Sequence, residues 1–466
     1  MIQQTAPHQR REQIDDPRMA NTLATEPDSK LPSSIERRTI NLAVARLDAW
    51  LETMHGPGGY GGPVCHWWQQ CFTYTGAGLD WRYEGIITGY LNLWQRTGES
   101  RWRERAIRAG QDLIGGQQSD GTFAFSGFEM NPARMGTPHE AACDVALLRL
   151  ASALRQDGNE SWMMPFNAAG QNIRHVYLER LWDEERQRIS DGKPDASFVP
   201  NKAATASNAL ISLATMSGDA ELIDHYAIPT INHILDHQIR ADSPFDGAIA
   251  QNSFGSQQID KYFPIYIARC IPALLEAWSL TGSERYIDAA VAAMRFIDRW
   301  VVDDGSIPTV VYPDGRTSTG PMWIAPLGDI LLAFDLISPF ETFATHEAVL
   351  SRMLNGQDET GGIQTATKFE CQSGWKASEL PDVRDLLHVA GWCDKAFRYL
   401  SRHVSEDPLP SASPSEFVRS ATFLRDEYLF RETCERVEIT KEDELRYLWV
   451  KGEAHPQVAA KEFWIR

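Results

Sequence analysis

Polar and aromatic side chains that could act on a sugar gather at six places, each at the start of an apolar helical stretch. These places are 78–84, 137–140, 198–202, 257–262, 320–323 and 382–388. With their close neighbours they contain Asp80, Glu84, His139, Glu140, Asp144, Asp260, Asp382, Arg82, Lys202, Lys261, Arg384, Trp67, Trp68, Trp81, Tyr262 and Trp323. Aromatic faces stack on the C–H faces of sugar rings, and hydrolysis of a glycosidic bond needs two carboxyl groups. The pattern therefore favours carbohydrate chemistry.

We assign candidate roles by residue type. The predicted catalytic residues are Asp80, His139, Glu140 and Asp260. The predicted substrate-binding residues are Trp81, Arg82, Asn201, Lys202, Lys261, Tyr262, Trp323, Arg384 and His388. In a lyase, His139 or Tyr262 would instead remove a proton, while Asn201 or Arg82 neutralised a uronate carboxylate.

Each of these residues also has a purely structural interpretation. An acidic residue at a helix start commonly caps the helix. The tryptophans could fill the core, and His139 could be a hydrogen-bonded structural histidine. The functional hypothesis therefore depends on the recurrence of such residues at equivalent positions.

Motifs for other chemistries are missing from the sequence. The glycines of 56–62 match neither a phosphate-binding loop nor a dinucleotide fingerprint, and the chain has no Gly-x-Ser-x-Gly. Cys65, His66 and Cys71 are not followed by a second cluster at zinc spacing. We predict no metal and no cofactor.

A weak internal repeat shows which elements must position these residues. Gly98, Gly158, Gly218 and Gly282 lie about 60 residues apart, each in a short turn between two helical stretches. A second turn recurs as Asp-Gly before alternating apolar residues, near 120, 246, 304 and 358. Asp191-Gly192 resembles a looser copy of this second turn.

The apolar periodicity between these turns predicts twelve helices. Their ranges are 36–54, 80–96, 99–116, 138–156, 160–181, 201–216, 219–237, 261–280, 284–301, 321–337, 341–355 and 384–403. Twelve helices in six hairpins predict an all-α (α/α)6 barrel, with the even-numbered helices inside and short strands between hairpins. An open solenoid is the alternative.

The chain divides into three predicted parts: a disordered or extended leader over 1–35, the toroid over 36–404, and a linker with a C-terminal extension over 405–466. Within the extension we expect a helix near 416–430. The segments 446–450 and 462–465 could be strands or packing arms. The extension could also mediate contacts between copies in a homo-oligomer.

The composition indicates which classes of partner and which cellular compartment to expect. The net charge of −18 argues against nucleic acid, and no run of 18 apolar residues could span a membrane. The leader has no apolar core typical of a signal peptide. The seven cysteines form no CxxC pair, which is typical of buried thiols in a reducing compartment. We expect a cytoplasmic protein that binds an oligosaccharide.

The repeated turns over residues 36–404 resemble those of the six-hairpin glycosidase superfamily. The matching residues are Thr97–Trp102, Thr281–Tyr286 and the Asp-Gly strand turns. The superfamily includes unsaturated glucuronyl hydrolases, rhamnogalacturonyl hydrolases and N-acylglucosamine 2-epimerases, and some polysaccharide lyases share its toroid. The resemblance implies acids near the starts of neighbouring inner helices, where this chain has Asp80 and the pair His139-Glu140. The pair is His-Glu and not His-Asp.

Three functions remain open. The first is a glycoside hydrolase with a carboxylate acid/base pair that acts on an oligosaccharide, which could contain uronate. The second is a polysaccharide lyase or uronyl epimerase on the same scaffold. The third is a non-catalytic toroid that serves as an assembly or carbohydrate-binding subunit.

Overall fold

The computed structural model describes residues 35–64, 73–75, 77–126, 136–192, 197–369, 383–410, 412, 417–423, 426–453 and 457–458. Twelve α-helices occur within these residues, as predicted. They are α1 Arg37–Thr53, α2 Arg82–Thr97, α3 Ser100–Gly115, α4 Ala141–Gln156, α5 Met163–Asn172, α6 Pro200–Ser217, α7 Ile228–Asp236, α8 Pro264–Thr281, α9 Glu284–Arg299, α10 Leu327–Ile337, α11 His346–Asn355 and α12 Ala390–Leu400. Wider π-type turns extend α5 over Ile173–Leu181 (η3) and precede α7 over Leu222–Ala227 (η4).

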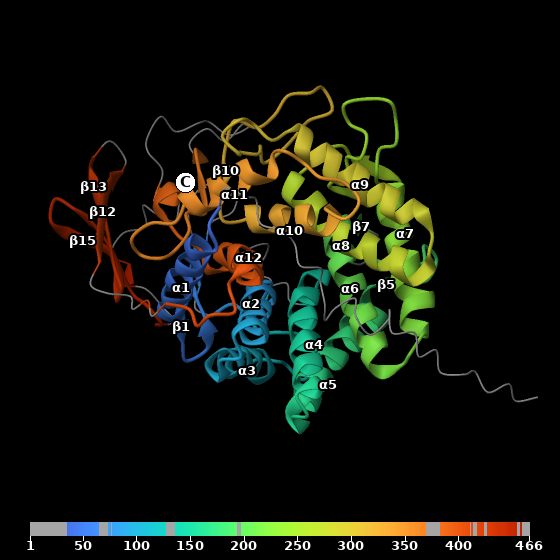
Figure 1. Ribbon diagram of the computed structural model, residues 1–466, viewed down its shortest axis with the longest axis horizontal. Helices are drawn as coiled ribbons and strands as arrows, with labels where there is room; N and C mark the ends of the chain where they lie inside the picture. The colour runs from blue at the N-terminus through green and yellow to red at the C-terminus, as the bar shows by residue number, and fades with distance from the viewer. Residues whose placement is uncertain are drawn as a thin grey trace, which may run out of the picture.

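The six even-numbered helices form a closed inner ring. Each packs against the next in the order α2, α4, α6, α8, α10 and α12, and α12 packs back against α2 (Figure 1). The odd-numbered helices surround this ring. The inner helix α2 is buried over most of its circumference, whereas α3 buries only one face. The predicted (α/α)6 barrel, with even-numbered helices inside, is therefore confirmed.

The Asp-Gly turns join neighbouring outer helices. The Gln238 side-chain amide donates to Gly247 O at 3.2 Å and to Ala289 O of α9 at 2.9 Å. Gln117 bridges its own turn to α5 in the same way, and Gln357 bridges its turn to α1. The last of these bonds, to Ala43 O at 2.9 Å, connects the end of the repeat to its beginning.

The four glycines between inner and outer helices have the conformation that their position requires. Their φ angles are 69° at Gly98, 71° at Gly158, 75° at Gly218 and 66° at Gly282. This left-handed region is costly for residues with a Cβ atom. The glycines therefore end or follow their helices and let the chain reverse, as the repeat predicted.

Several inner helices begin later than predicted. The helix α8 begins at Pro264, not at 261, because Phe263 before the proline is extended. Similarly, α10 begins at Leu327, after Pro326, and not at 321. A 3-10 turn, η6 (Val383–Leu386), occupies the predicted start of α12, which itself begins at Ala390. A 3-10 turn, η1 (Pro138–Glu140), also leads into α4.

Short antiparallel strands connect the hairpins at the helix starts. They are β1 His55–Gly56 with β2 Gly59–Tyr60, β3 Gly62–Val64 with β4 Thr73–Thr75, β5 Trp182–Asp183 with β6 Arg188–Ile189, β7 Ser197–Phe198 with β8 Asn252–Phe254 and β9 Gln257–Ile259, and β10 Met322–Trp323 with β11 Ala366–Thr367. The predicted inter-hairpin strands are thus present.

The C-terminal extension is a five-stranded antiparallel sheet. Its strands, in order, are β12 Val418–Phe423, β13 Tyr428–Thr433, β14 Arg436–Lys441, β15 Glu444–Val450 and β16 Gln457–Val458. The predicted helix near 416–430 is wrong, because exposure alternates along β12 and β13, which meet at a turn with Asp426 at φ 65°. Of the two alternatives for 446–450, a strand or a packing arm, the structure has the strand, within β15, whereas 462–465 lie outside the described residues.

The sheet is fastened to the toroid by buried ion pairs. Arg419 of β12 lies 3.1 Å from Asp358 and donates to Leu386 O at 2.6 Å. Glu432 of β13 pairs with Lys451 at 2.7 Å and faces His388 of the toroid. Buried charges of this kind are costly to separate, so they fix the sheet's place beside the ring.

The described residues contain no helix that is long and apolar enough to cross a membrane. Among the cysteines in this part of the chain, Cys143, Cys270 and Cys393 are buried free thiols, as expected, and Cys434 is half-buried.

Candidate functional site

A central cavity of about 560 Å³ lies at the N-terminal ends of the inner helices. All six inner helices or their leading segments contribute to its wall. The lining residues are Trp81, Glu84, Pro138, His139, Ala142, Asp191, Val199, Asn201, Lys202, Thr205, Gln251, Asn252, Phe254, Ile265, Tyr266, Arg269, Pro326, Asp329, Trp392 and Lys395. The location is the one that the helix starts predicted.

An ion network joins four of the inner helices, α2, α8, α10 and α12, beside the cavity. Arg269 of α8 lies 2.7 Å from Glu84 of α2 and 3.8 Å from Asp329 of α10. Arg398 of α12 hydrogen-bonds both carboxylates, one with each terminal nitrogen. Burial alone would raise the pKa of Glu84, but Arg269, Arg398 and Lys395 outweigh it and hold the pKa well below its usual range. Glu84 is therefore a fixed anion.

Two further cavity cations have carboxylate partners. Lys202 Nζ lies 2.7 Å from Asp191 Oδ1, and Lys395 Nζ lies 2.7 Å from Asp394 Oδ2. Asp394 is fully buried behind Lys395, and burial raises the pKa of Asp394 to about 7 although Lys395 opposes the shift. Lys202, Arg269 and Lys395 thus bring three positive charges to one cavity.

His139 is the cavity residue best suited to proton transfer. Its Nε2 atom is buried and has no hydrogen-bond partner among the described residues. The ring meets Trp81 edge-on, with centroids 4.2 Å apart. Burial, together with Lys202, Lys395 and Arg269, lowers the pKa of His139 well below its ordinary value. The imidazole is therefore neutral and can accept a proton.

Two indoles form an aromatic wall beside this histidine. Trp81 donates from Nε1 to Gly391 O at 2.7 Å, which fixes its ring across the joint between α2 and α12. Trp392 lies 6.0 Å from Trp81, between centroids, and packs on the buried Trp323 at 5.2 Å. Trp81 and Trp392 are mostly buried and both line the cavity, so the part of each ring that is not packed against the protein faces the cavity.

Four of the predicted site residues line the cavity together: Trp81, His139, Asn201 and Lys202. They come from the starts of α2, α4 and α6, which are neighbours in the inner ring.

Asp80 and Arg82 lie outside the cavity lining. Both side chains are buried, and Arg82 binds the Asp80 carboxylate with Nε at 2.8 Å and Nη2 at 2.9 Å. Arg82 also donates to Tyr60 O at 3.0 Å. The bidentate pair stabilises the start of α2, so we no longer assign Asp80 a catalytic role or Arg82 a substrate-binding one.

Glu140 also has a structural role. Its carboxylate accepts hydrogen bonds from Gly136 N at 2.9 Å, Asn172 Nδ2 at 2.7 Å, Phe123 N at 3.3 Å and the Ser126 hydroxyl. These donors belong to the turn after α3, to α5 and to the segment just before η1, and Glu140 does not line the cavity. Burial raises its pKa despite these donors. Of the pair, only His139 reaches the cavity.

The segment 260–262 is displaced from the site because α8 begins at Pro264. Asp260 and Lys261 are exposed, and Asp260 accepts a hydrogen bond from Gln258. Tyr262 is buried between Phe245 and Phe296, at centroid distances of 5.7 and 5.9 Å. None of the three residues lines the cavity.

Trp323, Arg384 and His388 likewise support the structure. Trp323 packs behind Trp392, and the Arg384 guanidinium lies 4.7 Å from the centroid of Phe369. His388 is buried, with Nε2 3.1 Å from Asp358 and Nδ1 3.7 Å from Glu432. None is a lining residue. Trp67, Trp68 and Asp382 lie outside the described residues.

Sequence reasoning overlooked cavity residues that lie deeper in the inner helices. Arg269 and Lys395 are charged residues within mostly apolar inner helices, one or two turns from the helix start. A charge in such a helix must find a partner or line a cavity, so it was a usable signal. Asp329 had the same signal, and Trp392, which is uncharged, had none. Asp191 and Phe254 lie on strand connections that the periodicity does not reveal.

The (α/α)6 fold is shared with solved structures of sugar-active enzymes. An unsaturated glucuronyl hydrolase specific for heparin is similar over 80% of this chain and 99% of its own, with TM-score 0.58 and 12% identity. A D-mannose isomerase gives the same figures. An inactive variant of an α-1,6-mannanase from Salegentibacter sp. HEL1_6, in complex with α-1,6-mannotetrose, covers 78% of this chain and 98% of its own, with TM-score 0.51 and 11% identity.

These solved structures, at 11–12% identity, share the fold with this chain. No protein-family profile matches the sequence, and neither does any curated protein. Because the fold hosts both hydrolases and an isomerase, the chemistry of this chain must be argued from its own cavity.

Proposed function

We propose that this protein is a carbohydrate-active enzyme whose central cavity binds a sugar that carries a carboxylate, and that His139 transfers a proton during the reaction. The observation that carries the proposal is a neutral imidazole with an unpartnered Nε2, which shares one cavity with two indoles and with three cations paired to carboxylates. The fold is common to enzymes that act on sugars, which supports the substrate class.

The lining matches the two kinds of surface on a sugar. The faces of Trp81 and Trp392 suit the C–H face of a pyranose ring. Asn201, Gln251, Asn252 and Tyr266 offer amide and hydroxyl groups to its hydroxyls. A volume of about 560 Å³ accommodates a short oligosaccharide better than a polymer segment.

The cavity cations favour an acidic sugar. Lys202 and Lys395 each have a carboxylate partner within the protein, but lysine has three donors and can also bind a ligand carboxylate. An anion bound there would offset the charges that lower the pKa of His139. Binding the substrate would therefore increase the proton affinity of His139 when it is needed.

The chemistry best suited to this arrangement is removal of a proton next to the sugar carboxylate or carbonyl. Glu84 and Asp329 are clamped by Arg269 and Arg398, so neither is free to supply a proton. His139 has no such clamp. Lysines near the carboxylate would stabilise the enolate that forms. Epimerases, isomerases and lyases that remove such a proton need this stabilisation.

Hydrolysis of a glycosidic bond is the second candidate. It is favoured by Asp191, a lining carboxylate on the connection before β7 that pairs with Lys202. Asp191 could act as base or nucleophile, although the acid would then have to be His139. Glycoside hydrolases among the structures of the same fold give this candidate its support.

Product analysis on a panel of saturated and unsaturated uronate oligosaccharides and simple aldoses separates these reactions. Proton abstraction incorporates solvent deuterium or creates a new ultraviolet-absorbing double bond, whereas hydrolysis releases a reducing end. We expect His139→Gln to lower kcat by about 10²- to 10⁴-fold. The control is His175→Gln, on the outer surface beside Glu179. Full activity in His139→Gln would contradict the proposal, and hydrolysis lost in Asp191→Asn would favour the second candidate.

A further inference from the structure

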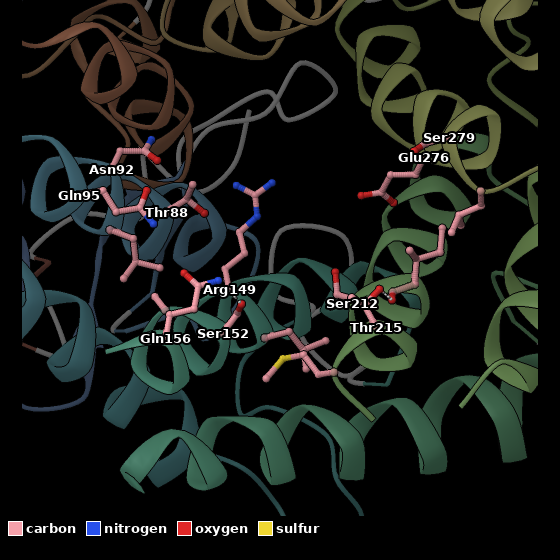
Figure 2. A pocket seen from close by; sticks show the side chains of 16 residues that line it. Thr88, Asn92, Gln95, Arg149, Ser152, Gln156, Ser212, Thr215, Glu276 and Ser279 are labelled. Atoms are coloured by element: carbon pink, nitrogen blue, oxygen red, sulfur yellow. Dashed lines mark hydrogen bonds between the residues drawn. The ribbon is translucent and has the colours of Figure 1, made fainter. Parts of the chain in front are cut away.

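A second cavity lies at the opposite end of the inner ring. It is lined by the C-terminal halves of four consecutive inner helices, α2, α4, α6 and α8, and has a volume of about 100 Å³ (Figure 2). Its lining residues are Thr88, Leu91, Asn92, Gln95, Leu148, Arg149, Ser152, Ala153, Gln156, Ile211, Ser212, Thr215, Met216, Glu276, Ser279 and Leu280. None of them lines the central cavity.

An arginine and a glutamate reach into this second cavity from different helices. Figure 2 shows the Arg149 guanidinium, from α4, and the Glu276 carboxyl group, from α8, facing one another across the open space. Glu276 Oε2 is buried and has no hydrogen-bond partner among the described residues. Burial raises the pKa of Glu276 to about 8, although Arg149 opposes the shift, so its carboxyl group is mostly protonated at neutral pH.

Other polar side chains also line the cavity, and some of their hydroxyl groups already donate hydrogen bonds within their own helix. The Ser212 hydroxyl donates to Asn208 O at 2.7 Å, and the Thr215 hydroxyl donates to Ile211 O at 2.8 Å. Their oxygen lone pairs can still accept, so the α6 and α8 side of the cavity is rich in acceptors. Across the cavity, Arg149 and the Thr88 hydroxyl, which has no partner in the described chain, can donate.

We propose that this second cavity binds a small zwitterionic amino acid, with its carboxylate on Arg149 and its ammonium group on Glu276. The donor and acceptor sides match the two ends of a zwitterion. The volume has room for a solute of roughly five to ten non-hydrogen atoms, which fits glycine, alanine or serine and excludes a sugar ring with its substituents. The site is separate from the proposed sugar site and does not depend on it.

Binding is expected to be linked to protonation. An ammonium group beside Glu276 favours its ionised form, so the carboxyl group loses its proton as the ligand enters. Affinity should therefore rise between about pH 6 and pH 8, and the protein should release a proton at neutral pH. Glycerol, which is of similar size but uncharged, should bind more weakly than glycine and release no proton.

Isothermal titration of the full chain with glycine, alanine and glycerol, in buffers of different ionisation enthalpy, tests this site. We expect glycine to bind in the millimolar range. Glu276→Gln keeps the shape but not the charge, so it should weaken glycine binding about tenfold and abolish proton release. Glu284→Gln, on an exposed surface, is the matched control and should change neither.

Three results would overturn the proposal: no binding of either amino acid, equal binding of glycerol and glycine, or undiminished glycine binding by Glu276→Gln. Thermal unfolding of each variant without ligand shows that it is folded. A variant that unfolds can be replaced by Ser212→Leu, which fills the cavity from α6 and should also abolish binding.

Discussion

At the scale of residues, His139 differs from His388 and His403 in having no acid beside it. His388 lies between Asp358 and Glu432, and His403 lies 2.9 Å from Asp335. The charges that act on His139 are instead the cations Lys202, Lys395 and Arg269. A histidine placed in this way stays neutral well into the acid range, which is useful for a base and of no evident use for stability.

The pH dependence of activity should follow from this arrangement. Because the pKa of His139 lies well below its ordinary value, we expect kcat/KM to persist below pH 6.5 on the acid side. Lys202→Met removes one cation, so the pKa of His139 rises and the acid limb moves to higher pH. Loss of a charged contact to the substrate should also raise KM about tenfold. An acid limb that stays in place in Lys202→Met would contradict this account.

At the scale of elements, two kinds of turn glycine have different tasks. Gly282, at φ 66°, has open space where a Cβ would lie. Gly305, at φ 78°, packs on α11, and a Cβ there would lie 2.1 Å from Ala348 O. Glycines such as Gly282 only let the chain reverse. Glycines such as Gly305 also let an Asp-Gly turn pack closely against the next outer helix.

This difference predicts unequal costs for the same substitution. Gly282→Ala should lower the free energy of unfolding by about 1 kcal/mol, which is the cost of a left-handed alanine. Gly305→Ala adds a collision with backbone and should cost about 3 kcal/mol or more. Urea unfolding of both variants measures the two values. Equal losses would show that the turn does not depend on its contact with α11.

At the scale of the whole molecule, the ring is closed twice and then fastened to a sheet. The α2–α12 joint closes the inner ring, and the Gln357–Ala43 hydrogen bond closes the outer one. The C-terminal sheet is attached where this closure occurs, through Arg419, Glu432 and His388. Its attachment therefore stabilises the junction between the first and last hairpins.

The attachment should depend on pH in a defined direction. The acids around His388 raise its pKa despite its burial, so its stabilising charge is present below pH 6.5 and is lost as pH rises through the elevated pKa. Their own pKa values are lowered, so Asp358 and Glu432 remain charged over this range.

We therefore expect His388→Gln to lower the free energy of unfolding by about 3 kcal/mol near pH 5.5 and by clearly less near pH 9. Urea unfolding at both pH values measures the difference, with His225→Gln, at the surface, as the control. A loss that is the same at both values would mean that His388 acts through packing and not through its charge.

Local sequence signals predicted most of the elements but fewer than half of the site residues. Turn glycines and apolar periodicity are local properties, so the helices were recognisable in all six hairpins. The site depends on the first turn of each inner helix, where an error of three residues moves a side chain to another surface. That is what happened at 260–262, because Pro264 delays the start of α8.

The amino-acid sequence was sufficient to establish six hairpins, their order, the inner and outer helices and the end of the ring at which a cavity lies. These follow from repeats of about 60 residues and from helical periodicity, which are carried by neighbours along the chain. The partner of each charge was settled by packing across the ring. Asp80 meets Arg82 locally, whereas Glu84 meets Arg269 and Arg398 from distant hairpins. Ion pairing depends on distance in space, so only the closed ring could separate the helix-start acids that stabilise the fold from the residues that face the cavity.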